Sequence, residues 1–455
     1  MKNLTQGKPI KVILLFTVPL LIGQLFQLFY SLVDTRIVGQ ILGEQALAAV
    51  GATTSLSDLF IFFIFGATNG FAIITASCFG AKDACGVRKA IAGTIILAEG
   101  MAVVLSVFCL SFINPILHFL KVDEGLISDA KSYICVILAG LVISTLYNIC
   151  AATMRAVGDS VTPLIFLIIS AFLNIVLDYF MIAFLNMGVA GAAVATILSQ
   201  LISAFFCVIY ILKKYPELIP KKDDYVLDKH ITNKQIMAGI SMGFMNSLIG
   251  AGTLCLQTQI NSFGSEIIVS HTASRKLFSL LSMPFFVLST ALSNFSAQNM
   301  GAGRIDRIKE GLKDTTLFSF GWSVVSIIVI HFFTGSLAKQ IIGMDAPSII
   351  GTTEKYMRFA SYFFPILAMV CLFRNTMQGF GDSVTPVVSS LIELLVKVLI
   401  AFLLCPFIAY DGVILCEPLA WCIMVIPLIV NMLRSPLYKK RDTFKEVFWK
   451  NAFCI

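Results

Sequence analysis

The stretch TMRAVGDSVTP at 153–163 returns as TMQGFGDSVTP at 376–386, with eight of eleven residues identical. Each copy follows an apolar segment long enough to cross a bilayer and precedes another such segment. The repeat therefore predicts an internally duplicated membrane protein. Duplication is typical of transporters, because two similar helix bundles can rock about a shared cleft, whereas a receptor or membrane enzyme has no such need.

The composition predicts a chain whose surface faces lipid. The 455 residues are 58% hydrophobic and 13% charged, with a mean hydropathy of +0.89, whereas a soluble domain is about 25% charged. We predict an all-α polytopic membrane protein with twelve transmembrane helices in two six-helix lobes. The helices are expected near 12–34, 46–75, 90–113, 131–153, 163–184 and 189–212, and near 234–261, 267–297, 314–334, 355–376, 386–408 and 412–433.

The repeat extends beyond the phrase and sets the predicted domains. Leu42-Gly43 matches Phe263-Gly264, and both halves continue with a Gly-Ala pair and a basic stretch. Six helices separate equivalent points, so the two copies run through the membrane in the same direction. The predicted parts are an N-terminal lobe (1–212), a charged cytoplasmic linker (213–233), a C-terminal lobe (234–433) and a cytoplasmic tail (434–455).

Charge predicts the orientation. If both termini lie on one side, Lys and Arg outnumber those on the other side by roughly three to one, which places both termini in the cytoplasm. Contact with anionic lipid headgroups also accounts for the net charge of +7. We therefore expect the lipid bilayer, and no nucleic acid, as a partner.

The repeated phrase itself is interpreted as structural. Its acids, Asp159 and Asp382, follow glycine and favour a turn. Thr162 and Thr385 are predicted to cap the next helix, with the following proline at its first position.

Ionisable groups inside a membrane are costly, at about 2.5 to 3.5 kcal/mol near a helix centre, so each one suggests a function. The predicted fifth helix carries Asn174 and Asp178, which are four residues apart and share a face, and Thr196 lies in the sixth. At the equivalent places the second half has, in order, Lys397, Ala401 and Ala420. The sequence therefore predicts a single cation site in the first half. The alternative for Asp178 is a buried acid hydrogen-bonded to Asn174 for folding only.

The first helix adds a polar stripe. Gln24, Gln27, Ser31 and Asp34 follow a 3, 4, 3 spacing, which places them on one face of an otherwise apolar helix. Such a stripe favours an interior cleft, and Pro19 before it is a candidate hinge. For Asp34, a solvated residue at the outer end of the helix is an equal alternative.

Other polar residues allow more than one interpretation. Asp58, halfway along the second helix, is either a cleft group that attracts cations or an acid capped by Ser55 and Ser57. Glu393 and Lys397 stand four apart and are expected to pair within the second lobe, with substrate contact as the alternative. Lys397 is the one Lys or Arg expected inside a predicted span. Glu99, in the third predicted helix, has no assigned role. The four His are scattered, so no metal site is expected.

Taken together, several segments resemble the multidrug and toxic compound extrusion (MATE) transporters. They are SLVDTRIVGQILGEQALAAVGAT (31–53), FGAKD (79–83), the repeated GDSVTP, LNIVLDY (173–179), SAQNMGAGR (296–304) and EPLAW (417–421). The resemblance covers nearly the whole chain. It implies two six-helix lobes around a central cleft and a cation-coupled antiporter of the bacterial inner or plasma membrane that exports amphipathic, often cationic, compounds.

By position, the family's cation site falls on the residues already selected, Asp34, Asn174, Asp178 and Thr196, with Tyr133 nearby. The seventh helix lacks the acid that many relatives carry, which makes the chain similar to the DinF-like branch. The resemblance implies H⁺ or Na⁺ as the coupling ion, no other cofactor, no enzymatic activity, and a monomer that binds small amphipathic molecules. Na⁺ would bind at Asp34 and Asp178.

Two rival functions are less well supported by the residues. A flippase for lipid-linked precursors or polysaccharides should carry several cationic residues in its cavity to hold pyrophosphate. A membrane enzyme should carry a cluster such as D-D-x-x-D, which Asp223-Asp224 in the linker does not complete.

Overall fold

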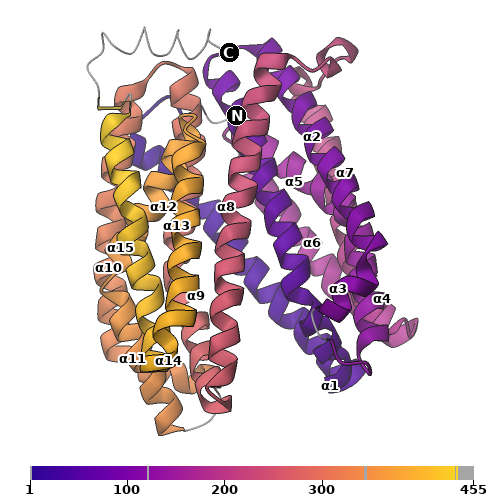
Figure 1. Cartoon of the computed structure of the whole chain (residues 1–455). Helices are drawn as coiled ribbons and strands as arrows, with labels where there is room; N and C mark the ends of the chain where they lie inside the picture. Colours follow the sequence, from indigo (N-terminus) through magenta and orange to yellow (C-terminus); the bar gives the residue numbers. More distant parts are fainter. Residues whose placement is uncertain (1–2, 120–121, 343–345, 436, 439–455) are drawn as a thin grey trace. The chain divides into compact units, whose positions relative to one another are not determined.

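The computed structural model describes residues 3–119, 122–342, 346–435 and 437–438, and every regular element in these ranges is a helix (Figure 1). The first half contains α1 (Pro9–Gly80), α2 (Ala84–Ser111), α3 (Ile113–Phe119), α4 (Ile127–Ala139), α5 (Leu141–Ala156), α6 (Val161–Tyr179), the π-helix η1 (Phe180–Phe184), α7 (Gly188–Lys214) and the short 3₁₀ turns η2 (Pro216–Leu218) and η3 (Lys222–Tyr225). The second half contains α8 (Lys229–Ser262), α9 (Ser265–Gly301), α10 (Ile305–Ile342), α11 (Pro347–Ser361), α12 (Phe364–Gly379), α13 (Val384–Leu399), the π-helix η4 (Ile400–Leu404), α14 (Cys405–Ile408) and α15 (Tyr410–Arg434).

The predicted fold class is confirmed. Within the described ranges, 10 helical segments are long and apolar enough to cross a membrane, and two bent pairs bring the number to 12. The bent pairs are α4 with α5, at 43°, and α11 with α12, at 55°. The π-helices η1 and η4 also occupy equivalent places, after α6 and α13. Most of the predicted tail, residue 436 and residues 439–455, lies outside the described residues.

Glycine marks the same break in both halves. The first two predicted spans form one long helix, α1, and its single non-helical residue is Gly43, with φ 84°. Gly264 between α8 and α9 has φ 91°. Only glycine adopts such angles without strain, which explains the repeated glycine. The helix continues through Pro19, so the observed break lies at Gly43 and a hinge at Pro19 stays a prediction.

The chain packs as two compact units that exchange short segments. Among the described residues, those between 15 and 247 form most of the first unit, and those in 4–14 and between 248 and 438 form the second. In the second unit, Leu4 N–H donates to Gln298 Oε1 (3.0 Å). In the first, Gln235 of α8 donates to the Ala90 carbonyl (2.7 Å). These units are defined by packing, so the bounds of the two predicted lobes stay a prediction.

The repeated phrase forms the predicted turn, but its cap differs. Gly158 and Gly381 have φ of 85° and 99°. The carboxylate of Asp159 accepts the Thr162 N–H (3.0 Å) and the Thr162 hydroxyl (2.7 Å), and Asp382 does the same with Thr385. The prediction that threonine caps the helix is wrong, because aspartate is the capping acceptor.

Candidate functional site

Two carboxyl groups meet in the interior of the first unit. Asp34 lies on α1 and Asp178 on the last turn of α6, and their carboxyl groups are within hydrogen-bond reach of each other. Asp178 is 0% exposed. Among the described residues, no donor reaches Asp34 Oδ1 or either oxygen of Asp178. Asp34 is half-buried, and it does not lie at a helix end, since α1 continues well past it.

Asn174 and Thr196 lie beside the acids without satisfying them. The Asn174 amide donates to Thr196 Oγ1 (3.4 Å), and Thr196 donates in turn to the Ala192 carbonyl (3.1 Å). Asn174 Oδ1 has no donor within the described part of the chain. The hydrogen bond between Asn174 and Asp178 that a purely structural acid would need is therefore not observed.

An apolar layer holds together the helices that carry Asp34, Asp178 and Thr196. Val38, Ile182 and Ala192 pack together with Tyr133 against them. Val38 and Ile182 are four residues after Asp34 and Asp178, and Ala192 is four before Thr196, so each lies one turn along the same helix face. Packing of this layer holds α1, η1 and α7 so that the acids face each other.

Two tyrosines and a third acid surround the pair. Tyr133 and Tyr30 both lie close enough to Asp34, Asp178 and Asp58 to interact electrostatically with them. Tyr30 was not predicted, although it stands four residues before Asp34 and three after Gln27 on the same face. The sequence did not indicate Tyr30 as a site residue, because an aromatic side chain in an apolar helix is usually interpreted as part of the packed core.

The other predicted residues lie as follows. Gln24 and Gln27 are exposed on α1. Asp58 is half-buried, and the Ser57 hydroxyl donates to the Thr53 carbonyl (2.9 Å), so it does not cap the acid. Glu99 is half-buried on α2, and its Oε2 has no hydrogen-bond partner in the described ranges.

The candidate site brings together several hydrogen-bond acceptors that have no hydrogen-bond donor. Four buried oxygens, from Asp34, Asn174 and Asp178, lack a hydrogen-bond donor among the described residues. An unsatisfied buried oxygen costs about 1 to 3 kcal/mol, and more when it is charged. A proton between the carboxyl groups, or a small cation among the oxygens, would remove that cost. In the described part of the chain, no group of three His, Cys, Asp or Glu forms a larger metal site.

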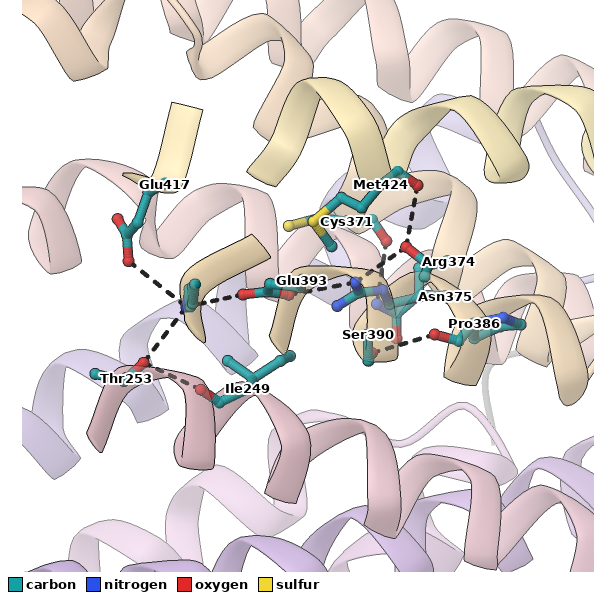
Figure 2. Close-up of polar contacts among 12 residues, drawn as sticks. Ile249, Thr253, Cys371, Arg374, Asn375, Pro386, Ser390, Glu393, Glu417 and Met424 are labelled. Carbon is teal, nitrogen blue, oxygen red and sulfur yellow. Dashed lines mark hydrogen bonds and ion pairs between the residues drawn. The ribbon is translucent and has the colours of Figure 1, made fainter. Parts of the chain in front are cut away.

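The second unit contains a contrasting cluster of paired charges (Figure 2). Lys397 on α13 is 2% exposed and contacts Glu393 Oε1 at 3.0 Å and Glu417 Oε1 at 3.9 Å. Arg275 on α9 contacts Glu417 at 2.7 Å, and Arg374 on α12 contacts Glu393 at 3.5 Å. The predicted pairing of Glu393 with Lys397 is confirmed, but Lys397 is not the one cation inside a span.

Neutral groups complete the cluster. Lys397 Nζ donates to Thr253 Oγ1 on α8 (3.5 Å), and the Tyr356 hydroxyl on α11 donates to Glu417 (3.3 Å). Arg374 also donates to Ser389 Oγ (3.2 Å). The chain of contacts runs Arg275, Glu417, Lys397, Glu393, Arg374, so three cations alternate with two acids. Sequence reasoning missed Arg275, Glu417 and Arg374 because their partners come from other helices.

The duplicated helical fold and the polar interior of each unit define a polytopic membrane transport protein. The sequence model of the MatE family matches residues 19–180 and 241–403, one copy in each half. The chain therefore belongs to the MatE family of multidrug efflux transporters, as the resemblance implied. Whether it falls in the DinF-like branch stays a prediction.

Individual relatives agree with this assignment. The chain is 26% identical over 393 residues to the probable multidrug resistance protein YpnP of Bacillus subtilis, covering 86% of this chain and 87% of that protein. It is 24% identical over 398 residues to the FAD transporter of Shewanella oneidensis, covering 86% of each. An outward-facing multidrug resistance MATE transporter of known structure superposes with a TM-score of 0.88, at 22% identity over 97% of this chain and 99% of that one, which shows the shared fold.

Proposed function

We propose that this protein is a secondary active antiporter that exports amphipathic, often cationic, compounds in exchange for H⁺ or Na⁺ by alternating access. The observation that carries the proposal is the carboxyl pair of Asp34 and Asp178, whose oxygens are buried without donors. The multidrug resistance name of the Bacillus subtilis relative supports the substrate class. The FAD transporter among the relatives leaves the individual substrate open.

In the proposed cycle, the cation and the substrate compete through the shape of α1. Neutralising one carboxylate of the pair removes the repulsion between Asp34 and Asp178, and so changes how α1 packs against α6. Asn174 and Thr196 would supply neutral oxygens to the cation, and Pro19 and Gly43 are the points where α1 can bend. Gln24 and Gln27, exposed on the same helix, are the proposed substrate contacts.

The available energy is sufficient for efflux. One proton contributes about 1.4 kcal/mol per pH unit and one charge about 2.3 kcal/mol per 100 mV. Together these hold a substrate gradient of roughly one to two decades or more.

We further propose that the protein acts as a monomer in the plasma membrane with both termini in the cytoplasm.

A flippase for lipid-linked precursors is the second candidate. The sequence argues against a flippase because it predicts too few cations inside the membrane spans. The structure places three such cations in the second unit, so that objection has to be examined again. Each of them contacts Glu393 or Glu417, so none of the three is left free to hold a pyrophosphate. The antiporter therefore remains the better-supported function.

The test is efflux from liposomes that contain the purified protein and a fluorescent cationic drug. Separate pH and Na⁺ jumps are applied to the wild type and to Asp178→Asn. We expect one of the two jumps to drive efflux in the wild type and neither to do so in the variant. A wild type that responds to neither jump would contradict antiport, and normal efflux by the variant would contradict the site.

A further inference from the structure

A groove on the first unit lies where α6 and α7 pack against each other, near the end of α7. Its volume is about 310 Å³. The lining residues are Phe166 from α6 and Phe206, Ile209, Tyr210, Lys213 and Lys214 from α7. Positions 206, 210 and 213 follow the 4, 3 spacing of one helix face, so the groove runs along α7.

The floor of the groove is apolar and well supported. The rings of Phe166 and Tyr210 meet edge to face, with centroids 6.0 Å apart. Behind them lies a buried cluster of Cys150, Met154 and Cys207. Phe206 is 44% exposed at the rim, so an aromatic surface remains open along the groove.

The mouth of the groove is basic. Lys213 and Lys214 are exposed in the last turn of α7, and in the described ranges neither forms an ion pair, even with Glu217 of the following η2. Nearby, Arg88 and Lys89 of α2 are neutralised by acids of the linker. The two unpaired cations thus stand at the end of a membrane span, above an apolar groove.

We propose that this groove binds an anionic phospholipid, with its headgroup phosphate at Lys213 and Lys214 and an acyl chain along Phe206 and Phe166. Basic residues at the end of a span attract anionic headgroups, and the length of the groove gives a chain an apolar path. A zwitterionic lipid fits less well, because its own cation would face the lysines. Neither lysine has a counterpart in the second half, since the positions equivalent to 206, 210, 213 and 214, in the register that pairs Thr196 with Ala420, are Val430, Arg434, Leu437 and Tyr438.

The site is connected to the repeated turn. The Thr162 hydroxyl donates to Asp159 Oδ2 (2.7 Å) and lies 3.3 Å from Tyr210 OH, and Tyr215 OH donates to the same Asp159 oxygen (2.9 Å). Lys214 is followed directly by the linker between the two halves. A lipid bound here would therefore contact the end of the first half without touching the acid pair, and the proposal is independent of the coupling cation.

The test uses the full chain in vesicles, with Phe206→Trp as a reporter at the rim. Brominated phosphatidylglycerol and brominated phosphatidylcholine are titrated separately, and the quenching of the chain without the reporter is subtracted. Each lysine near a membrane surface contributes about fivefold to the binding of anionic lipid, so we expect a preference for phosphatidylglycerol of up to roughly 30-fold. Native mass spectrometry of the unaltered chain gives an independent count of retained lipid.

The matched variants are Lys213→Gln with Lys214→Gln, and Lys222→Gln with Lys229→Gln, which remove the same charge elsewhere on the first unit. The first pair should abolish the preference and the second should preserve it. Equal quenching by the two lipids in the parent, or an unchanged preference after loss of Lys213 and Lys214, would overturn the proposal. Displacement of the lipid by millimolar inorganic phosphate would also overturn it, because the groove would then be a site for free anions.

Discussion

The two units hold ionisable residues inside their helix bundles in opposite ways. In the first, Asp34 and Asp178 face each other and their buried oxygens find no donor among the described residues. In the second, three cations and two acids alternate in contact around a fully buried Lys397. Figure 2 shows the part of this cluster from Glu417 to Arg374. Paired charges can be explained by folding, whereas unsatisfied acceptors oppose it. This difference supports the proposal that the acid pair, rather than the charge cluster, is the cation site.

The largest effect is expected for Asp178→Asn. The amide keeps the shape of the side chain but cannot exchange a proton or balance a cation, so cation-driven efflux should fall to the liposome background. The thermal midpoint should stay the same or rise, because repulsion between the two acids is removed. Asp129→Asn, at an exposed position of the same unit, is the control and should behave as the wild type. If Asp178→Asn loses transport only because it unfolds, Asp178 serves folding in the same way as the charge cluster of the second unit, and the proposed difference between the two units is wrong.

In the second unit, Glu393→Gln should mainly reduce stability. Without this acid, Lys397 keeps its long ion pair with Glu417 and its hydrogen bond to Thr253, and Arg374 loses its carboxylate partner. Breaking a buried ion pair in this way costs about 3 to 5 kcal/mol. Denaturant unfolding in detergent measures it. If Glu393→Gln is as stable as the wild type, the cluster does not hold α12 and α13 together.

Lys397→Met tests the same cluster and should lower the free energy of unfolding less than Glu393→Gln does. The change leaves two cations and two acids, paired as Arg275 with Glu417 and Arg374 with Glu393. Replacing a buried charge by an apolar residue of similar length while the rest stays balanced should change the unfolding free energy by about 1 kcal/mol or less. The check is the same denaturant series. A loss equal to that of Glu393→Gln would mean that Lys397 carries the cluster.

The smallest effect concerns the linker of the first unit and its dependence on pH. The Lys221 N–H donates to Asp224 (2.8 Å) and Arg88 pairs with it (2.9 Å), so the pKa of the Asp224 carboxyl lies below its ordinary value. The docking energy is therefore fully present above the ordinary pKa of about 4 and is lost as pH falls through the folded value. Hydrogen exchange of residues 215–228 should show this loss on acidification. Asp224→Asn should weaken the pH dependence and leave only the part due to Asp228, which pairs with Lys89. Constant protection in the wild type would contradict it.

Most of the fold could be predicted from the sequence because lipid makes the pattern strong. Apolar runs gave every long helix, and the repeated Gly43 and Gly264 gave the shared break. The helix ends were less accurate, since α1 runs without interruption past Asp34 to Gly43. A polar residue near the expected end of a span cannot be distinguished from a loop residue by hydropathy.

The acid pair could be predicted because it differs from its repeat. Asp178 and Asn174 stand where the second half has Ala401 and Lys397. The second cluster could not be predicted as a whole, because Arg275, Glu417 and Arg374 come from three helices that only folding brings together. Spacing along one helix revealed only the pair of Glu393 and Lys397.

The most direct test of the acid pair is a thermal unfolding series on the purified protein. Na⁺ is titrated at fixed pH and pH is lowered at fixed Na⁺, for the wild type, Asp178→Asn and Lys397→Met. A cation that binds the folded state raises the midpoint by mass action. We predict that the midpoint rises with one of the two cations in the wild type and in Lys397→Met, and that Asp178→Asn does not respond. A wild type insensitive to both cations, or an equal rise in Asp178→Asn, would contradict the assignment.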